Sequence, residues 1–168
     1  MADPQLWLLR HGEAVPHESK DDFDRELTAR GERQAIAAGQ ALARLGVEFA
    51  AIYTSPKVRA ADTARLAAEA LSVEPEEEDL LGNGFDREDA LELIGRHDDD
   101  ARVLVVGHDP SFTQVVHDLT GGRVDFKKGG VVGIRLGGAP ELIVLLRPRE
   151  LESLAGDAMT HSAVADTD

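Results

Sequence analysis

The strongest constraint on the fold is a repeated order along the chain, in which a short apolar run ends at polar residues and a helical pattern follows. Three such apolar runs lie at residues 5–9 (QLWLL), 50–54 (AAIYT) and 102–106 (RVLVV). Continuous apolar runs of this length are typical of strands that are buried on both faces of a sheet. Strands that alternate with helices along a sequence pair mainly in parallel. We therefore predict an α/β fold, a three-layer sandwich with a mostly parallel central sheet flanked by helices.

Capping residues indicate where the helices begin. Thr28 precedes a segment rich in Ala, Leu, Gln and Arg, which predicts a helix over residues 29–45. Ser55 as cap and Pro56 as first residue predict a second helix up to residue 71. The other expected elements are helices over 86–97 and 110–119, the latter capped by Asp109, strands over 131–136 and 142–146, and a solvated loop at the acidic run 76–79.

The length of 168 residues is that of a single domain. We assign residues 1–150 to this domain and residues 151–168, which are small and polar, to a partly disordered C-terminal tail. No run approaches the roughly 20 apolar residues that cross a bilayer, and the first residues do not form a secretory signal. The expectation is a cytoplasmic protein with no membrane association. The absence of cysteine excludes disulfides and thiolate metal sites.

The formal net charge of -14 limits the kinds of partner. Nucleic-acid-binding proteins normally present a basic face, so nucleic acid is not an expected partner. A protein partner is expected to offer a basic face, an inference from net charge alone. A phosphorylated substrate would also be repelled by most of this surface, so a phosphate site has to be a local cluster of Arg and His.

Polar residues that follow the three predicted strands form such a cluster. In α/β sheets, ligands bind beyond the carboxyl ends of the strands. Arg10 and His11 follow the first strand, residues 55–59 follow the second, and His108 follows the third. Arginine binds two phosphate oxygens with its planar fork, and nearby helix N-termini add N–H donors. These positions therefore predict a site for a phosphoryl group.

Four segments at these positions resemble one known family, the histidine phosphatase superfamily. They are LRHGEA at 9–14, LTARG with QA at 27–35, TSPKVRAADTA at 54–64 and VGHDP at 106–110, in the order that the superfamily shows. The resemblance implies a phosphoglycerate mutase-like fold and an enzyme that needs no cofactor and no metal. It also implies that His11 attacks phosphorus and becomes phosphorylated, while Arg10, Arg59 and His108 bind the phosphoryl oxygens. Adjacent guanidinium groups favour the neutral, nucleophilic form of His11.

The branch within the superfamily depends on the general acid. Members that act on phosphate esters usually carry a Glu that protonates the leaving oxygen, in a segment that is short in this chain. The chain more closely resembles the compact SixA-type phosphohistidine phosphatases, which lack that acid. Protein-bound phosphohistidine is therefore the expected substrate, since imidazole is a better leaving group than an alkoxide. Candidate acids remain open at Glu76, Glu77, Glu78, Asp79 and Asp109.

Other functions and roles stay open beside this hypothesis. A small-molecule phosphomonoesterase of the same superfamily would use one of the acids at 76–79, and a phosphoprotein-binding module would lack turnover. A dinucleotide-binding domain is excluded because no G-x-G-x-x-G follows the first strand. The histidines outside the motifs are interpreted as surface or structural residues, although His17 is near enough to His11 to touch substrate; they are His17, His97, His117 and His161. Lys20 and Arg25 are interpreted as surface charge, with a grip on a phosphorylated partner as the alternative, and Thr63 is interpreted as helix packing.

Overall fold

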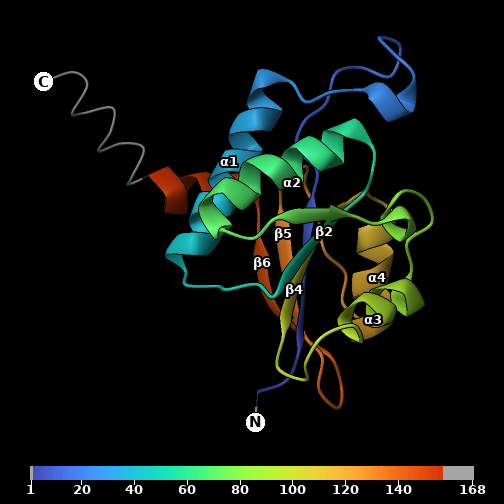
Figure 1. The fold of residues 1–168 in the computed structure, drawn as a ribbon, viewed down its shortest axis with the longest axis vertical. Coiled ribbons are helices and arrows are strands. Elements are labelled where there is room, and N and C mark those ends of the chain that lie inside the picture. Colours follow the sequence, from blue (N-terminus) through green and yellow to red (C-terminus); the bar gives the residue numbers. More distant parts are fainter. Residues whose placement is uncertain (1, 157–168) are drawn as a thin grey trace, which may run out of the picture.

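A computed structural model describes residues 2–156, which fold around one six-stranded sheet (Figure 1). The strand order is β3-β2-β4-β1-β5-β6. Strands β3, β2, β4 and β1 run parallel, whereas β5 is antiparallel to both β1 and β6. The mostly parallel sheet predicted from the sequence is confirmed. The strands are β1 (Gln5–Arg10), β2 (Ala51–Thr54), β3 (Pro75–Glu77), β4 (Arg102–Gly107), β5 (Val131–Arg135) and β6 (Glu141–Leu146).

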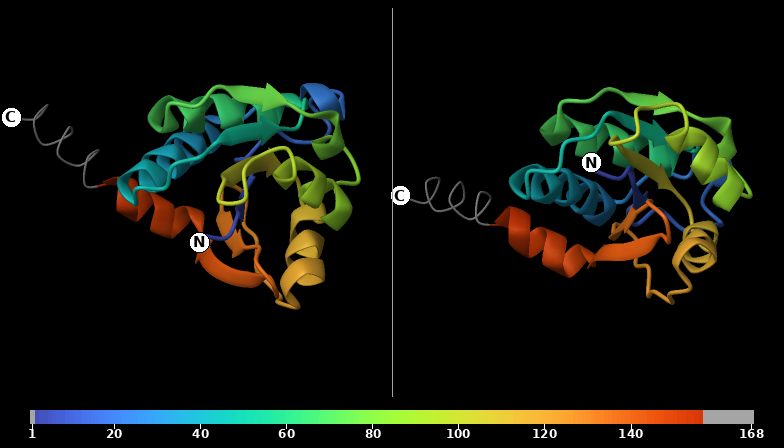
Figure 2. Two further views of the ribbon diagram at one scale, coloured as in Figure 1. Left: turned by 60° about the horizontal axis from the view of Figure 1, so that its bottom comes forward. Right: turned by 90° about the horizontal axis from the view of Figure 1, so that it is seen from below.

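Helices cover both faces of this sheet (Figure 2). Helices α1 and α2 pack on one face, and α3 and α4 pack on the other. The three-layer arrangement is therefore confirmed. The helices are α1 (Ala29–Arg44), α2 (Val58–Leu71), α3 (Arg87–Ile94) and α4 (Ser111–Thr120), with short 3-10 turns η1 (Asp22–Asp24) and η2 (Asp79–Leu81).

The side chains of β1 show why its sequence is apolar throughout. Leu6 and Leu8 belong to the core cluster beneath α3 and α4. Trp7 and Leu9 belong to the cluster beneath α1 and α2. Successive side chains of a strand point to opposite faces, and both faces of this strand are buried.

Helices α1 and α2 approach each other closely through small residues. A Cβ atom added to Gly39 in α1 would collide with the carbonyl oxygen of Ala67 in α2. Alanines that are buried on both helices complete the contact, and they include Ala38, Ala41, Ala60, Ala64 and Ala68. This close packing fixes the two helices against each other on one face of the sheet.

Two local predictions were wrong. The acidic run at 76–79, expected to be a loop, contributes residues 76 and 77 to the edge strand β3, which pairs in parallel with β2. Propensity disfavours Glu in strands, but an edge strand leaves these side chains in solvent. Helix α2 starts at Val58, two residues later than expected, and the cap position is Lys57 with no side-chain cap. The Ser55 hydroxyl contacts both the Lys57 N–H and His108, as described below.

The domain also extends past the boundary expected at residue 150. Residues 148–156 are helical, and Leu151 and Ala155 are fully buried in the core beside α1 and α2. The part of the expected tail at residues 157–168 lies outside the described residues. Among the helices that the structure describes, none is both long and apolar enough to span a bilayer.

Candidate phosphoryl-transfer site

The carboxyl ends of three adjacent strands bring the predicted residues together. Strand β4 lies between β1 and β2, so the segments that follow all three strands meet at one edge of the sheet. The His11 N–H donates to the Gly107 carbonyl oxygen at 3.0 Å, and the Ser55 N–H donates to the Val106 carbonyl oxygen at 3.0 Å. These two bonds continue the sheet by one residue and place His11, Ser55 and His108 side by side.

His11 is held in a neutral form with one nitrogen free to react. Its Nδ1 lies 2.7 Å from the carbonyl oxygen of Gly12. A carbonyl oxygen can only accept, so the proton of the neutral ring sits on Nδ1 and the lone pair sits on Nε2. The side chain is buried, and burial, together with the charges of Arg59 and Arg10, lowers the pKa of His11 to about 3. His11 is therefore neutral at physiological pH.

His108 faces His11, and the centroids of the two rings are 5.2 Å apart. Its Nε2 lies 2.8 Å from the Ser55 hydroxyl oxygen. Burial and the charges of Arg59 and Lys57 lower the pKa of His108 to about 3. The same Ser55 oxygen accepts a hydrogen bond from the Lys57 N–H at 3.2 Å. Ser55 therefore links His108 to the start of α2, where the sequence predicted a helix cap.

Two arginines complete the predicted set. Arg10 donates from Nη1 to the carbonyl oxygen of Phe126 at 2.6 Å. Arg59, which is 5% exposed, donates from Nη1 to the carbonyl oxygen of Asp22 at 2.8 Å. Within the described chain, Nε of Arg10, Nε of Arg59 and Nδ1 of His108 are buried without a hydrogen-bond partner. Buried polar atoms of this kind normally have partners, so this arrangement suits an oxyanion.

The loop after β1 is fixed by a network around Gly12. Its N–H donates to the Thr63 hydroxyl at 3.1 Å, and Thr63 in turn donates to the carbonyl oxygen of Arg59. A Cβ on Gly12 would lie 2.5 Å from the Gly31 carbonyl oxygen at the start of α1. Thr63, which we interpreted as helix packing, therefore joins the His11 loop to the Arg59 backbone. The sequence carried no signal for this bond because the two partners are 51 residues apart.

All four predicted residues line one cleft of about 320 Å³. His17 and Arg25, which we assigned to the surface, line it too, together with Lys57 and Lys128. Lys20 instead pairs with Glu26. Within the described residues, no group of three or more His, Cys, Asp or Glu side chains is placed to hold a metal ion.

Asp22 is a site residue that the sequence analysis missed. Its carboxylate lies 3.3 Å from Lys57 Nζ, 3.4 Å from Arg59 Nη2 and 3.1 Å from Arg25 Nη2. Partial burial acts to raise its pKa, but Arg59 and the hydrogen bonds from Lys57 and Arg25 prevail and lower the pKa of Asp22 to about 2. The Asp22 carboxylate thus forms ion pairs with cations that line the cleft. Nothing in the pattern around residues 21–24 distinguishes it from an ordinary acidic loop.

The candidate general acids separate into two groups. None of the residues at 76–79 lines the cleft. Glu78 is held by Arg96 at 2.7 Å and accepts from the Leu80 N–H. Asp109 does line the cleft, and its Oδ2 lies 3.9 Å from Arg10 Nη1.

Asp109 was expected to be the N-cap of the fourth helix. The helix starts at Ser111, so Pro110 occupies the cap position. The Asp109 carboxylate nevertheless accepts from the Thr113 N–H at 2.9 Å and from the Thr113 hydroxyl at 2.7 Å. It therefore still satisfies a donor in the first turn of α4.

Comparison with known proteins agrees with this geometry. An uncharacterized protein of Picosynechococcus sp. is 33% identical over 162 residues, which cover 88% of this chain and 98% of that protein. The 2,3-bisphosphoglycerate-dependent phosphoglycerate mutase of Rhizobium etli is 35% identical over 101 residues, 58% of this chain and 47% of the mutase. The solved structure of the protein histidine phosphatase SixA complexed with tungstate shares the fold, with a TM-score of 0.78 at 23% identity over 88% of this chain and 99% of SixA.

The proteins that this chain resembles thus include a phosphatase by fold and a mutase by sequence. The sequence profile of the histidine phosphatase superfamily (branch 1) matches residues 6–83, which contain Arg10, His11 and Arg59. That match, the relative similar over nearly its whole length and the shared fold lead to one conclusion: this chain belongs to the histidine phosphatase superfamily.

Proposed function

We propose that this protein is a phosphatase that removes the phosphoryl group from protein-bound phosphohistidine, through a phosphohistidine intermediate on His11. The observation that carries this proposal is the bond between His11 Nδ1 and the Gly12 carbonyl oxygen at 2.7 Å. It fixes the tautomer that presents the Nε2 lone pair, and the depressed pKa keeps that lone pair available.

The reaction proceeds in two displacements. Nε2 of His11 forms a bond to phosphorus while the bond from phosphorus to the substrate imidazole breaks, and the released imidazole takes a proton from water. Water then attacks phosphorus of phospho-His11, the bond to Nε2 breaks, and inorganic phosphate leaves with His11 neutral again. Covalent catalysis of this kind divides one difficult step into two easier ones.

The negative charge of the transferring phosphoryl group is stabilised by Arg10, Arg59 and His108. Three nitrogens are buried and unpartnered within the described chain: Nε of Arg10, Nε of Arg59 and Nδ1 of His108. These nitrogens suit the equatorial oxygens of the phosphoryl group. A Ser55 hydroxyl that donates to Nε2 of His108 leaves the proton of this ring on Nδ1, where it can donate to the substrate. Positive charge and donors positioned in advance stabilise the transition state without reorganisation.

The choice of phosphohistidine rests on the acids near the cleft. The residues at 76–79 lie outside it, and Asp109 is held by Thr113 and near Arg10. A general acid contributes about 10² to 10⁴ in rate when the leaving group is an alkoxide. An imidazole leaving group needs this assistance less, so the site suits a P–N bond better than a P–O bond.

The decisive experiment compares kcat/KM for a phosphohistidine peptide and a matched phosphoserine peptide, with His11→Ala as the blank. We expect a preference of about 10² or more for phosphohistidine and an acid-labile phosphoenzyme that is absent in His11→Ala. Faster hydrolysis of the ester would contradict the substrate assignment. Tight binding of either peptide without release of phosphate would indicate a binding module.

A small-molecule phosphomonoesterase remains the second candidate because Asp109 lines the cleft. As a proton donor, Asp109 would matter for esters alone. Asp109→Asn would then lower the rate on esters by about 10² and leave the phosphohistidine rate nearly unchanged. Glu78→Gln, outside the cleft, is the matched control.

A further inference from the structure

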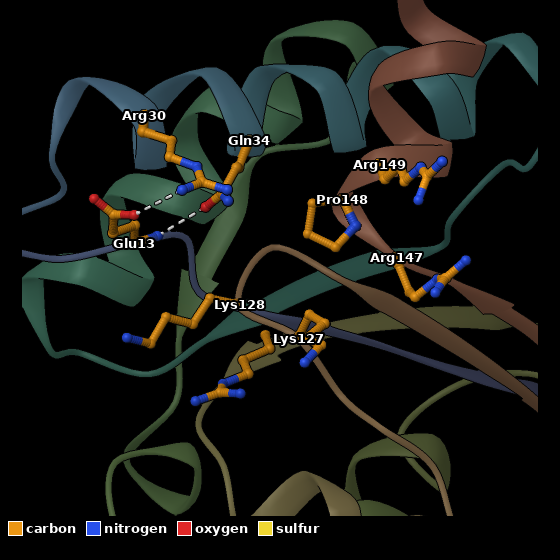
Figure 3. Close-up of a pocket in the computed structure, with 9 residues that line it drawn as sticks. Glu13, Arg30, Gln34, Lys127, Lys128, Arg147, Pro148 and Arg149 are labelled. Carbon is orange, nitrogen blue, oxygen red and sulfur yellow. Dashed lines mark hydrogen bonds and ion pairs between the residues drawn. The ribbon is translucent and has the colours of Figure 1, made fainter.

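A second, strongly cationic pocket lies beside the catalytic cleft (Figure 3). Its volume is about 450 Å³, and we call it the basic groove. Arg10 and Lys128 line both the cleft and the groove, so the two spaces are neighbours that share a wall. The cationic residues that line the groove are Arg10, Arg30, Lys127, Lys128, Arg147 and Arg149.

The charge of the groove is opposite to that of the whole chain. Glu13 is the single acidic residue among those that line it, in a protein of net charge -14. Glu13 lies 3.6 Å from Arg30. Lys127 pairs with Asp125 and Arg147 pairs with Glu150, whereas within residues 2–156 no carboxylate forms an ion pair with Lys128 or Arg149. The groove therefore keeps excess positive charge, which attracts an anion locally although the molecule as a whole repels it.

The loop that carries the two lysines is fixed against the nucleophile. The Gly129 N–H donates to the carbonyl oxygens of Arg10 and His11, both at 3.0 Å. Gly129 adopts φ +79°, and a Cβ there would lie 2.9 Å from Cβ of Gln34. Glycine therefore permits the turn and the close approach to α1 at once. The lysines at 127 and 128 are held beside the site before any ligand binds.

The cations are spread out and do not converge on one point. Figure 3 shows Arg30 on α1 and the two lysines on the loop before β5. Arg147 and Arg149 lie on the segment after β6, with Pro148 between them. This spacing suits several carboxylates along a peptide better than one compact phosphate. Arginine forks also match carboxylate geometry.

We propose that the basic groove binds an acidic segment of the protein substrate, made of Asp or Glu residues that flank the phosphohistidine. This inference rests on the proposed function, since it names the surroundings of the residue that His11 dephosphorylates. It also replaces the expectation, drawn from net charge, that a partner would offer a basic face. An acidic segment is attracted at the groove and repelled over the rest of the surface, which favours one orientation at the site.

The test uses two phosphohistidine peptides that differ in their flanks, Asp and Glu in one and Asn and Gln in the other. The quantity measured is the ratio of kcat/KM between the acidic and the neutral peptide. We expect wild type to prefer the acidic peptide by about tenfold, and Arg30→Gln with Arg149→Gln to lower that ratio about fivefold through KM. Both arginines are exposed and line the groove but not the cleft.

Arg135→Gln is the matched control because Arg135 is partly exposed on β5, pairs with Gln5 of β1 and lies at the opposite end of the sheet. Its ratio should equal that of wild type. A ratio near one in wild type, or the same ratio in the double variant, would overturn the acidic-segment proposal. Turnover of the neutral peptide, with His11→Ala as blank, reports on the proposed function independently. A further control compares inhibition by inorganic tripolyphosphate with inhibition by an unphosphorylated acidic peptide. If tripolyphosphate inhibits more strongly and its inhibition depends on Arg149, the acidic-segment proposal is also overturned.

Discussion

Two neutral histidines, one buried and one partly buried, make stability depend on pH. His11 and His108 both have a pKa of about 3 in the folded protein, against an ordinary value of 6.5. Between these two values the unfolded chain binds protons that the folded chain does not, so the free energy of unfolding falls as the pH is lowered. Each histidine contributes a slope approaching about 1.4 kcal/mol per pH unit.

Urea unfolding at pH 7 and pH 5.5 measures this effect. We expect wild type to lose about 1 kcal/mol per histidine over this interval, and His11→Asn to lose about half as much as wild type. Most carboxylates titrate below this window and change little. Equal losses in wild type and variant would mean that His11 takes up its proton in the folded state.

Asp22 is the residue whose removal should strengthen anion binding. Its carboxylate contacts Lys57 and Arg59, which would otherwise face the phosphoryl group alone. We expect Asp22→Asn to lower the inhibition constant of inorganic phosphate about two- to tenfold, since partly exposed ion pairs are worth about 0.2–1 kcal/mol each. Asp24→Asn, in the same 3-10 turn, is the control. Weaker inhibition in Asp22→Asn would show that Asp22 orders the cations and does not compete with phosphate.

At the level of elements, the contact between α1 and α2 sets the distance between the two helices. Alanine normally stabilises a helix by about 1 kcal/mol relative to glycine. At Gly39 the sign should reverse, because a Cβ would collide with the Ala67 carbonyl oxygen and force the helices apart.

We expect Gly39→Ala to lower the free energy of unfolding by about 1–3 kcal/mol, as measured by urea unfolding. Gly156→Ala provides the comparison, since this glycine is also helical and has nothing within 4 Å of an added Cβ. A Gly39→Ala protein as stable as wild type would show that the two helices can separate without loss.

At the level of the whole molecule, the helix over residues 148–156 closes the core. Leu151 is fully buried among side chains of α1 and the sheet, beyond the boundary expected at residue 150. We expect Leu151→Ala to cost about 2–5 kcal/mol of stability, and truncation after residue 150 to cost at least as much. Leu145→Ala, at a side chain that is 41% exposed, should cost much less when the variants are compared by thermal unfolding.

Charge is also arranged at the scale of the whole molecule. A chain of net charge -14 gathers Arg10, Arg59 and Lys128 at one end of its sheet. Net charge therefore predicts solubility and the exclusion of nucleic acid, but it did not predict the local field at the site.

Much of the fold, and the convergence of the candidate site residues, could be predicted from the sequence. Continuous apolar runs specified β1, β2 and β4, because burial on both faces leaves no place for polar side chains. The predicted positions of Arg10, His11 and His108 follow from the same runs, since parallel strands end at a common edge. The family segments added Arg59, which a position inside a helix would not have revealed.

The tertiary structure alone decided the features that depend on contacts between distant segments. Strand β3 forms because β2 offers a free edge, although its sequence is acidic. Asp22 meets Arg59 across 37 residues of sequence, and Thr63 meets Gly12 across 51. The basic groove joins α1, the loop before β5 and the segment after β6. Local periodicity and capping are written in neighbouring residues, whereas these contacts exist only after the chain has folded and brought the segments together.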